Sequence, residues 1–328
     1  MVTGGSGYIG SFVCRALDAA GHQVLVVDNL TRGNREAVDV PIEVGDVGDR
    51  TFLNRVFRLF APDAVMHLAA WIDVGESVAN PAKYFSNNVG ATFALLEAMA
   101  AHRTPWLIFS STAAVYGTSS STPISESSLP APQSPYGLSK LLTELALPSY
   151  SCAYGMKTVS LRYFNAAGAA LDGSAGPDHE SATHLITRAI QAALGKSKLV
   201  LFGGDYPTAD GTCIRDYIHV LDIASAHLLA LEHLRGGGAG GTYNIGTGTG
   251  HSNLEVIASV ERASGTPIEP TIGPRRPGDP VATVADAERA RTELRWDAKY
   301  SDLDTIVTSA WRWHSTHPRG YGSGLCSR

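Results

Sequence analysis

The sequence lacks long hydrophobic runs, clusters of basic residues and paired cysteines, and each absence excludes a class of protein. No apolar stretch approaches the ~20 residues that a membrane-spanning helix needs. The chain enters a glycine-rich turn within its first residues, which disfavours a signal peptide. Its 26 Lys and Arg against 31 Asp and Glu give a net charge of −5 without a basic patch, so we expect no nucleic-acid or membrane partner. We expect a cytoplasmic protein that holds any anionic ligand at a local site.

The cysteines are few and scattered, with no C-x-x-C pair and no metal-like spacing: Cys14, Cys152, Cys213 and Cys326. Reduced thiols in a cytoplasmic protein explain them best, and we expect no metal site. With 44% apolar and 17% charged residues, the 328-residue chain has the composition of a folded globular protein with one large domain or two smaller ones.

The first half of the sequence alternates short apolar runs with longer amphipathic stretches. The apolar runs, rich in β-branched residues, are 23–28, 64–70, 106–111 and 158–164. The stretches that predict helices are 9–20, 51–60, 90–102 and 135–153. Nearly continuous apolar runs are typical of parallel strands covered on both faces. We therefore predict an α/β fold with a Rossmann-type doubly wound parallel sheet, whose first strand is short or incomplete because only residues 1–3 precede the glycines.

The second half, after about residue 166, is interrupted by Gly- and Pro-rich segments with shorter elements between them. This pattern predicts a smaller C-terminal α/β domain that closes over a ligand. We place the sheet domain at residues 1–165 and the ligand domain at 166–328, with the segment of about 214–246 able to pack back onto the first domain.

A glycine-rich turn, Thr-Gly-Gly-Ser-Gly-Tyr-Ile-Gly at residues 3–10, stands before the first predicted helix. Glycines at this spacing let the backbone approach a pyrophosphate, and the helix N-terminus offers unpaired N–H groups to it. Asp28 ends the next strand, where its carboxylate can bind two ribose hydroxyls and repels a 2′-phosphate. The sequence therefore predicts an NAD site. Asp46 fits either an adenine contact or the cap of a turn.

Tyr136 and Lys140 form a Y-x-x-x-K pair on a helix that Ser134 and Pro135 are expected to begin. The spacing places both side chains on one helix face. A lysine ammonium and a cationic nicotinamide ring favour the phenolate and lower the tyrosine pKa from its usual ~10. An isolated pair of this kind is more often exposed surface, but Thr112 ends the preceding strand, and ligands sit at the carboxyl ends of parallel strands. We predict that Tyr136 is a general base assisted by Lys140 and Thr112.

A series of further motifs runs almost end to end along the chain: TGGSGYIG (3–10), VGESV (74–78), NNV (87–89), FSSTAAVYG (109–117), SPYGLSK (134–140), RYFN (162–165), DGTCIRDYIHV (210–220), YNIG (243–246), RRPGD (275–279), and W-x-W-H…HPRGY (311–321). The Thr–Tyr–Lys set with an N-terminal glycine turn is characteristic of short-chain dehydrogenase/reductases. With the motifs above, the sequence resembles, more narrowly, the UDP-glucose 4-epimerases of their extended branch.

The resemblance implies a set of site residues in addition to the catalytic three. The NAD contacts would be Gly4, Gly7, Tyr8, Ile9, Gly10, Asp28, Asn29, Asp46, Val47, Leu68, Ala69, Ala70, Asn87, Ser110, Tyr136, Lys140 and Tyr163. The UDP-hexose contacts would be Thr112, Tyr136, Asn165, His184, Leu185, Val200, Phe202, Arg215, Tyr217, Arg276, Asp279 and Thr283. Two arginines suit a diphosphate, although without the resemblance Arg215 and Arg276 would more often be ordinary salt-bridge partners.

The activity that the resemblance implies is NAD-dependent C4 epimerisation of a UDP-hexose through a transient 4-keto sugar. UDP-glucose and UDP-galactose are the expected substrates, and UDP-GlcNAc and UDP-GalNAc are further candidates. Epimerisation of another nucleotide sugar, such as UDP-xylose, UDP-arabinose or a specialised sugar, stays an alternative. A 4,6-dehydratase is less favoured because Ala113 and Ala114 stand where dehydratases carry an Asp-Glu pair. A non-catalytic NAD sensor is disfavoured because such proteins usually lose the Y-x-x-x-K pair, which is intact here.

Three positions bear on cofactor retention and substrate choice. Residues 71–73 read Trp-Ile-Asp, where many epimerases carry a lysine that assists the cofactor. His184 fits a diphosphate contact or a helix start without a ligand role. Thr283 occupies the position that resembles the gate of the sugar pocket, where a tyrosine excludes N-acetyl sugars, and it also suits a β-strand.

A homodimer is expected because two predicted helices carry more apolar residues than one sheet face needs. These residues are Leu95, Leu96, Met99, Leu138, Leu142 and Leu145. The alternative is that all of them face the sheet of their own chain.

Overall fold

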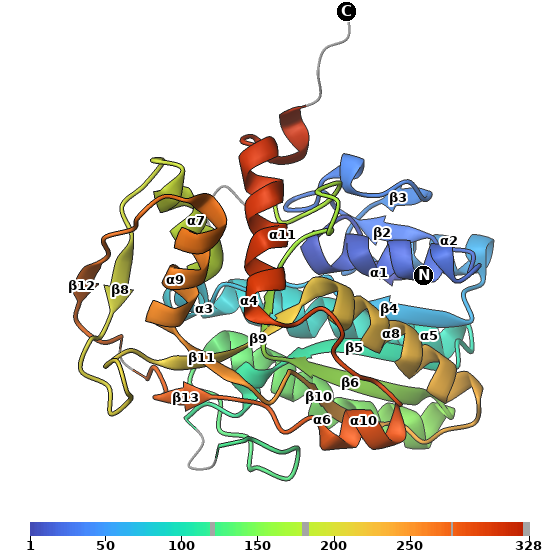
Figure 1. Cartoon of the computed structure of the whole chain (residues 1–328). Coiled ribbons are helices and arrows are strands. Elements are labelled where there is room, and N and C mark those ends of the chain that lie inside the picture. Colours follow the sequence, from blue (N-terminus) through green and yellow to red (C-terminus); the bar gives the residue numbers. More distant parts are fainter. Residues whose placement is uncertain (119–121, 179–183, 277, 324–328) are drawn as a thin grey trace, which may run out of the picture.

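A seven-stranded parallel sheet forms the centre of the computed structural model (Figure 1), which describes residues 1–118, 122–178, 184–276 and 278–323. Its strand order is β10-β6-β5-β4-β1-β2-β3. The strands are β1 (Val2–Thr3), β2 (Val26–Asp28), β3 (Ile42–Val44), β4 (Ala64–His67), β5 (Trp106–Thr112), β6 (Lys157–Tyr163) and β10 (Gly241–Ile245). The predicted Rossmann-type fold is confirmed. β1 is short, as predicted. β4 ends at His67 rather than at residue 70, at the level where its partner β1 ends with Thr3.

Helices cover both faces of this sheet because successive strand residues point to opposite sides. On one face, α1 (Tyr8–Ala19) and α8 (Val220–Arg235) pack over Val26 and Ile108. On the other, α2 (Arg50–Phe60), α5 (Thr92–Ala101) and α6 (Pro135–Tyr154) pack over Val27 and Leu107. The sheet is therefore doubly wound, and the carboxyl ends of its strands remain accessible for a site.

The helix predicted at 90–102 begins earlier and in a different form. A π-helical segment, Phe85–Ala91, leads directly into α5. The wider turn points the Asn88 side chain inward, where its amide accepts a hydrogen bond from the Trp71 N–H and donates one to the Trp71 carbonyl, both at 2.9 Å. These long-range bonds compensate for the altered helical ladder, a feature that periodicity in sequence does not reveal.

The remaining elements build a second body beside the sheet (Figure 1). Its strands are β7 (Asn165–Ala167), β8 (Val200–Phe202), β9 (Ile214–His219), β11 (Gly250–Ser252), β12 (Thr271–Gly273) and β13 (Ala282–Thr283). Its larger helices, α7 (Leu185–Ala193), α9 (Asn253–Ser264) and α11 (Leu303–Thr316), enclose a separate core. Between them α8 packs on α1 and β10 pairs with β6, so residues 220–245 lie with the first sheet. The division at residue 165 stays a prediction.

The short elements lie in the connections. They are η1 (Arg35–Ala37), α3 (Val74–Ala79), α4 (Pro81–Tyr84), η3 (Ala113–Val115), α10 (Glu288–Glu293) and η4 (Gly320–Ser323).

The six apolar residues on which the dimer prediction rested divide into two groups. Leu95, Leu96 and Met99 are fully buried in the chain's own core, so for α5 the dimer argument was wrong. On α6, in contrast, Leu138 and Leu142 are each 37% exposed and Leu145 is 65% exposed. The difference arises because α5 is enclosed by α2, α6 and the sheet, whereas α6 has one uncovered side.

In the part of the chain that the structure describes, no helix is long and apolar enough to span a membrane, and no cluster of metal-ligating side chains occurs. Cys14, Cys152 and Cys213 are free thiols, and Cys326 lies outside the described residues. Pro277, within the RRPGD motif, also lies outside them.

Candidate active site

The glycine turn brings backbone atoms closer together than any side chain would allow. Gly4 has φ +69°, and a Cβ built on it would lie 2.6 Å from the Ala69 nitrogen. A Cβ on Gly10 would lie 2.1 Å from the Gly4 carbonyl oxygen. α1 begins directly after Gly7, and no side chain caps it. Its first N–H groups are therefore available to an anion, which fits a dinucleotide pyrophosphate.

Asp28 lies beside this turn, at the end of β2. Its carboxylate accepts hydrogen bonds from the Ser6 N–H at 3.1 Å and the Leu30 N–H at 2.9 Å. Burial raises the carboxyl pKa, and the two backbone N–H groups oppose that shift. Gly33 packs against the carboxylate, because a Cβ there would lie 3.0 Å from both of its oxygens. The arrangement fixes one acidic group beside the glycine turn.

Asp46 performs the turn-capping role, since its carboxylate accepts from the Gly48 N–H at 2.7 Å. It also accepts from the Asn29 amide at 3.1 Å, so the structure brings these two predicted cofactor residues together. The contact with adenine stays a prediction.

The predicted catalytic set lies where β5 ends against the start of α6. Ser134 caps α6 by accepting from the Gly137 N–H at 3.2 Å. The Lys140 ammonium donates to the Ser110 carbonyl at 2.9 Å, and the Thr112 hydroxyl interacts with the Tyr136 phenol. The structure thus brings Thr112, Tyr136 and Lys140 together, as predicted for one crevice.

Burial dominates the pKa values of this set in the chain without its cofactor. It raises the pKa of the Tyr136 phenol, and the Thr112 hydroxyl opposes the rise only in part. The lowering expected from Lys140 and the cationic nicotinamide ring together stays a prediction for the cofactor-bound protein. Burial lowers the pKa of Lys140 to about 7, against the opposing effect of the Glu144 carboxylate.

Aromatic and imidazole groups surround these residues. Tyr84 packs edge-on against Tyr136, with ring centroids 6.5 Å apart. The Tyr163 hydroxyl hydrogen bonds with Ser110 and with His227 of α8. The His67 ring hydrogen bonds with the Thr3 hydroxyl through Nδ1, at 2.7 Å, and with the Thr92 hydroxyl of α5 through Nε2, at 2.8 Å. Burial lowers the pKa of His67 to about 3.

Sequence reasoning missed Glu144, His67 and His227. Glu144 lies four residues beyond Lys140, so helical spacing alone places it on the same face of α6. The two histidines belong to distant segments, and no local signal singles them out.

The predicted UDP residues gather around β9. Asn165 on β7 donates to the Asp216 carbonyl at 2.8 Å, and Tyr217 is its partner in the β7–β9 register. Arg215 lies 3.4 Å from Asp279, and Thr283 is its partner in the β9–β13 register. These residues therefore form one region of the second body.

Residues of β8 and α7 complete the set. Arg276 stacks on Phe202, with its guanidinium carbon 4.0 Å from the ring centroid, and Val200 begins the same strand β8. His184 precedes Leu185 at the start of α7 without capping it by a side-chain hydrogen bond. Burial lowers the His184 pKa, and the charge of Asp73 raises it.

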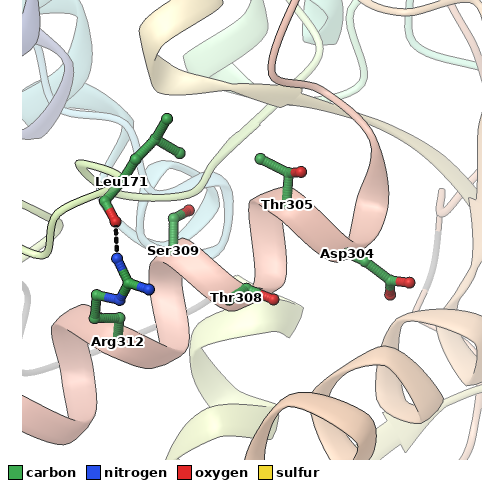
Figure 2. Close-up of a pocket in the computed structure, with 6 residues that line it drawn as sticks. All are labelled: Leu171, Asp304, Thr305, Thr308, Ser309 and Arg312. Atoms are coloured by element: carbon green, nitrogen blue, oxygen red, sulfur yellow. Dashed lines mark hydrogen bonds between the residues drawn. The ribbon is translucent and has the colours of Figure 1, made fainter.

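A separate pocket of about 370 Å³ lies on α11 (Figure 2). Figure 2 shows Arg312 reaching the Leu171 carbonyl across it, beside Ser309 and the other lining residues Asp304, Thr305 and Thr308. None of the six is a predicted site residue, so the pocket is not part of the candidate active site.

A doubly wound sheet with a glycine turn, an acidic residue after the second strand and a Thr–Tyr–Lys set defines a dinucleotide-dependent enzyme of the short-chain dehydrogenase/reductase class. Residues 1–246 match the model of the NAD dependent epimerase/dehydratase family. The chain belongs to that family.

Within that family, the chain is similar over nearly its full length to UDP-glucose 4-epimerases. A UDP-glucose 4-epimerase of Lacticaseibacillus casei is 46% identical over 324 residues, which cover 98% of each chain. The crystal structure of UDP-glucose 4-epimerase from Brucella ovis in complex with NAD has a TM-score of 0.93 and 46% identity, covering 94% of this chain and 96% of that one. The enzyme from Bifidobacterium longum in complex with NAD⁺ and UDP has a TM-score of 0.92 and 39% identity, covering 97% and 98%.

Proposed function

We propose that this chain is an NAD-dependent epimerase that interconverts UDP-glucose and UDP-galactose by inverting C4 through a 4-keto sugar. The observation that carries the proposal is the Thr112–Tyr136–Lys140 set at the end of β5. It occurs in a chain that aligns over nearly its full length with UDP-glucose 4-epimerases.

The cofactor is NAD, and the residues of the first body fit it. Gly4 and Gly10 allow the tight packing of the turn, and the uncapped start of α1 supplies N–H donors for the pyrophosphate. Asp28 supplies a carboxylate for the two ribose hydroxyls and disfavours a 2′-phosphate. When bound, NAD accepts a hydride from the sugar and returns it.

In this proposal Tyr136 removes the proton of the sugar 4-hydroxyl and later returns a proton to the 4-keto oxygen. Its raised pKa in the chain alone means that the phenolate needs a nearby positive charge, which the cationic ring of the oxidised cofactor and the Lys140 ammonium supply. Thr112 supports the phenolate through its hydroxyl. Lys140 also binds the nicotinamide ribose, and Ser110 and Tyr163 line the same end of the sheet.

Epimerisation requires that the sugar turn over while the nucleotide remains bound. Arg215 and Arg276 are suited to hold the diphosphate, since guanidinium groups bind phosphate oxygens in pairs. Asn165, Tyr217 and Phe202 surround the same region. The anchoring charges would therefore lie at the nucleotide end, and the hexose would be held loosely enough to present either face.

Thr283 favours a broad substrate range. Thr283 is half-buried and pairs with Arg215 in the β9–β13 register, which places it close to the proposed diphosphate site. A threonine side chain there leaves more room for a bulky sugar than a tyrosine would. We infer that UDP-GlcNAc and UDP-GalNAc are accepted as well as the unmodified sugars.

Three further features belong to this proposal. The exposed leucines of α6 support a homodimer formed through that helix. A cytoplasmic location and a role in galactose metabolism follow from the proposed reaction and from the free thiols, which suit a reducing compartment.

The test is incubation of the purified chain with a panel of nucleotide sugars, without added reductant, followed by separation of C4 epimers. We expect UDP-galactose and UDP-glucose to interconvert, while UDP-xylose and UDP-arabinose react more slowly. Conversion of a pentose sugar in preference to both hexoses would redirect the assignment, and formation of a 4-keto-6-deoxy product would indicate a dehydratase.

A further inference from the structure

A buried ion pair lies directly behind the catalytic set and takes no part in the mechanism above. Glu144 of α6 and Arg162 of β6 have side chains only 6% and 7% exposed. The guanidinium donates from Nε to both carboxylate oxygens, at 3.0 and 3.2 Å, and from Nη2 at 2.5 Å. Burying two charges in this way is costly, and such pairs are often replaceable by apolar residues without loss of stability. Its place beside Lys140 suggests a use other than folding.

Three consecutive residues at the end of β5 each contact a different residue on one face of α6. The Ser110 carbonyl accepts from the Lys140 ammonium at 2.9 Å, and the Thr112 hydroxyl interacts with Tyr136. Between them, the Ser111 hydroxyl donates to the Glu144 carboxylate. Tyr136, Lys140 and Glu144 follow one another at intervals of four residues, so they form a single row along the helix.

Arg162 extends this contact to the next strands. Its Nη1 donates to the Tyr116 hydroxyl at 2.8 Å, and that hydroxyl donates to the Asn244 side chain of β10 at 2.7 Å. The Glu144 carboxylate is therefore fixed from β5, β6 and, through Tyr116, β10. It has little freedom to move, and neither does the turn of α6 that carries it.

We propose that Glu144 is a positioning residue for the epimerisation: it fixes α6 against β5 and β6 so that Lys140 and Tyr136 meet Ser110 and Thr112, and it provides the anion that favours the Lys140 ammonium. This inference rests on the proposed function, since it assigns Glu144 a role in the chemistry of Tyr136.

The charges around Lys140 agree with this role. On α6 itself, Glu144 raises the Lys140 pKa against the lowering by burial, which brings it to about 7. From β4, the neighbouring His67 is held neutral by burial, with its pKa near 3. From β6, Arg162 is paired with Glu144, and Tyr163 is neutral because burial raises its pKa.

The charged side chains within α3 and α4, which pack on the start of α6, are paired with each other. On α3 and α4, Glu76 and Lys83 form an ion pair at 2.5 Å, and Tyr84 donates to the same Glu76 carboxylate at 2.9 Å. Removing the Glu144 charge should therefore lower the Lys140 pKa further, so that the ammonium loses its proton, and the phenolate its partner, at a lower pH.

The first test compares Glu144→Gln with Glu144→Asp, which keeps the charge. For conversion of UDP-galactose, we expect the Gln variant to shift the basic limb of the kcat profile down by about one pH unit, with KM within about twofold of wild type. The Asp variant should keep the wild-type limb even where its kcat is reduced. Equal limbs in wild type and Gln variant, or equal shifts in both variants, would overturn the electrostatic role.

The second test uses Ser111→Ala, which leaves both charges in place and should fold irrespective of the Gln variant. Loss of one hydrogen bond that fixes α6 should lower kcat by about threefold without moving the basic limb or the bound NAD content. A wild-type kcat would overturn the positioning role. Wild-type enzyme and Tyr136→Phe are measured in parallel: an inactive wild type, or an active Phe variant, would refute the proposed function itself rather than the part assigned to Glu144.

Discussion

Tyr136 is a base only in a particular electrostatic setting, because burial by itself raises the pKa of its phenol. The Thr112 hydroxyl contributes in the opposite direction, and the remaining shift must come from positive charge at the bound cofactor and at Lys140. In the proposed mechanism, the neighbours of Tyr136 therefore make its phenol a base, because an isolated tyrosine is a weak base at neutral pH.

Replacing Tyr136 with Phe should remove the ionisable oxygen and little else. We expect kcat for epimerisation to fall by ~10²–10⁴ while the bound NAD content stays near wild type. Tyr154→Phe, on the same helix but 61% exposed, is the matched control and should retain full activity. Wild-type turnover in Tyr136→Phe would show that another group is the base.

Asp28 should determine the choice of cofactor. A 2′-phosphate would meet its carboxylate, so we expect NADP to bind far more weakly than NAD in a fluorescence titration of the cofactor-free protein. Asp28→Asn removes the charge and should reduce the difference between the affinities for NAD and NADP. Equal affinities of the wild type for the two cofactors would contradict this role.

Thr283 should control the tolerance of the sugar pocket. Thr283→Tyr introduces a ring beside Arg215, and we expect it to reduce kcat/KM for UDP-GlcNAc by about tenfold or more relative to UDP-glucose. Thr283→Ser keeps the site small and should leave the ratio unchanged. If the tyrosine leaves the ratio unaltered, or the wild type ignores UDP-GlcNAc, Thr283 does not limit the pocket.

At the scale of elements, α6 carries both the proposed catalytic pair and the proposed dimer contact. Its first turns present Tyr136 and Lys140 to the sheet, whereas Leu138, Leu142 and Leu145 lie on a side that no part of the described chain covers fully. A helix that is buried on one side and apolar on the other is typical of one that pairs with a second copy.

The dimer prediction can be tested by placing a charge on that uncovered side. Leu145→Glu should give a monomer at micromolar concentration in light scattering, where the wild type gives a dimer, because an interface does not tolerate an unpaired buried charge. Leu59→Glu on α2, at a position 70% exposed, is the control and should stay dimeric. A wild-type monomer would refute the dimer.

The elements also show what periodicity could and could not predict. The glycine turn, the Asp28 strand end and the Tyr136–Lys140 helix are local patterns, and the sequence predicted where each of them lies. The π-helical segment at 85–91 depends on bonds between Asn88 and Trp71, which are distant in the chain. The burial of α5 and the partial exposure of α6 likewise depend on which elements pack against each helix, which periodicity does not reveal.

At the scale of the whole molecule, the two bodies are connected by more than one crossing of the chain. α8 and β10 return to the first sheet after β9 has joined the second body, so a single division of the sequence does not separate the two bodies. The Glu144–Arg162 pair likewise becomes visible only when α6 and β6 are in place. These features depend on tertiary contacts between distant segments, which composition and residue spacing do not reveal.

The fate of the hydrogen at C4 tests the proposed reaction most directly. UDP-galactose deuterated at C4 is incubated with the protein and its bound cofactor, and the UDP-glucose formed is analysed for deuterium at C4. We predict that the deuterium is retained at C4 and that no NADH accumulates, because the hydride leaves and returns within one site. Loss of deuterium to solvent, or a requirement for added oxidant or reductant in proportion to product, would contradict epimerisation through a transient 4-keto sugar.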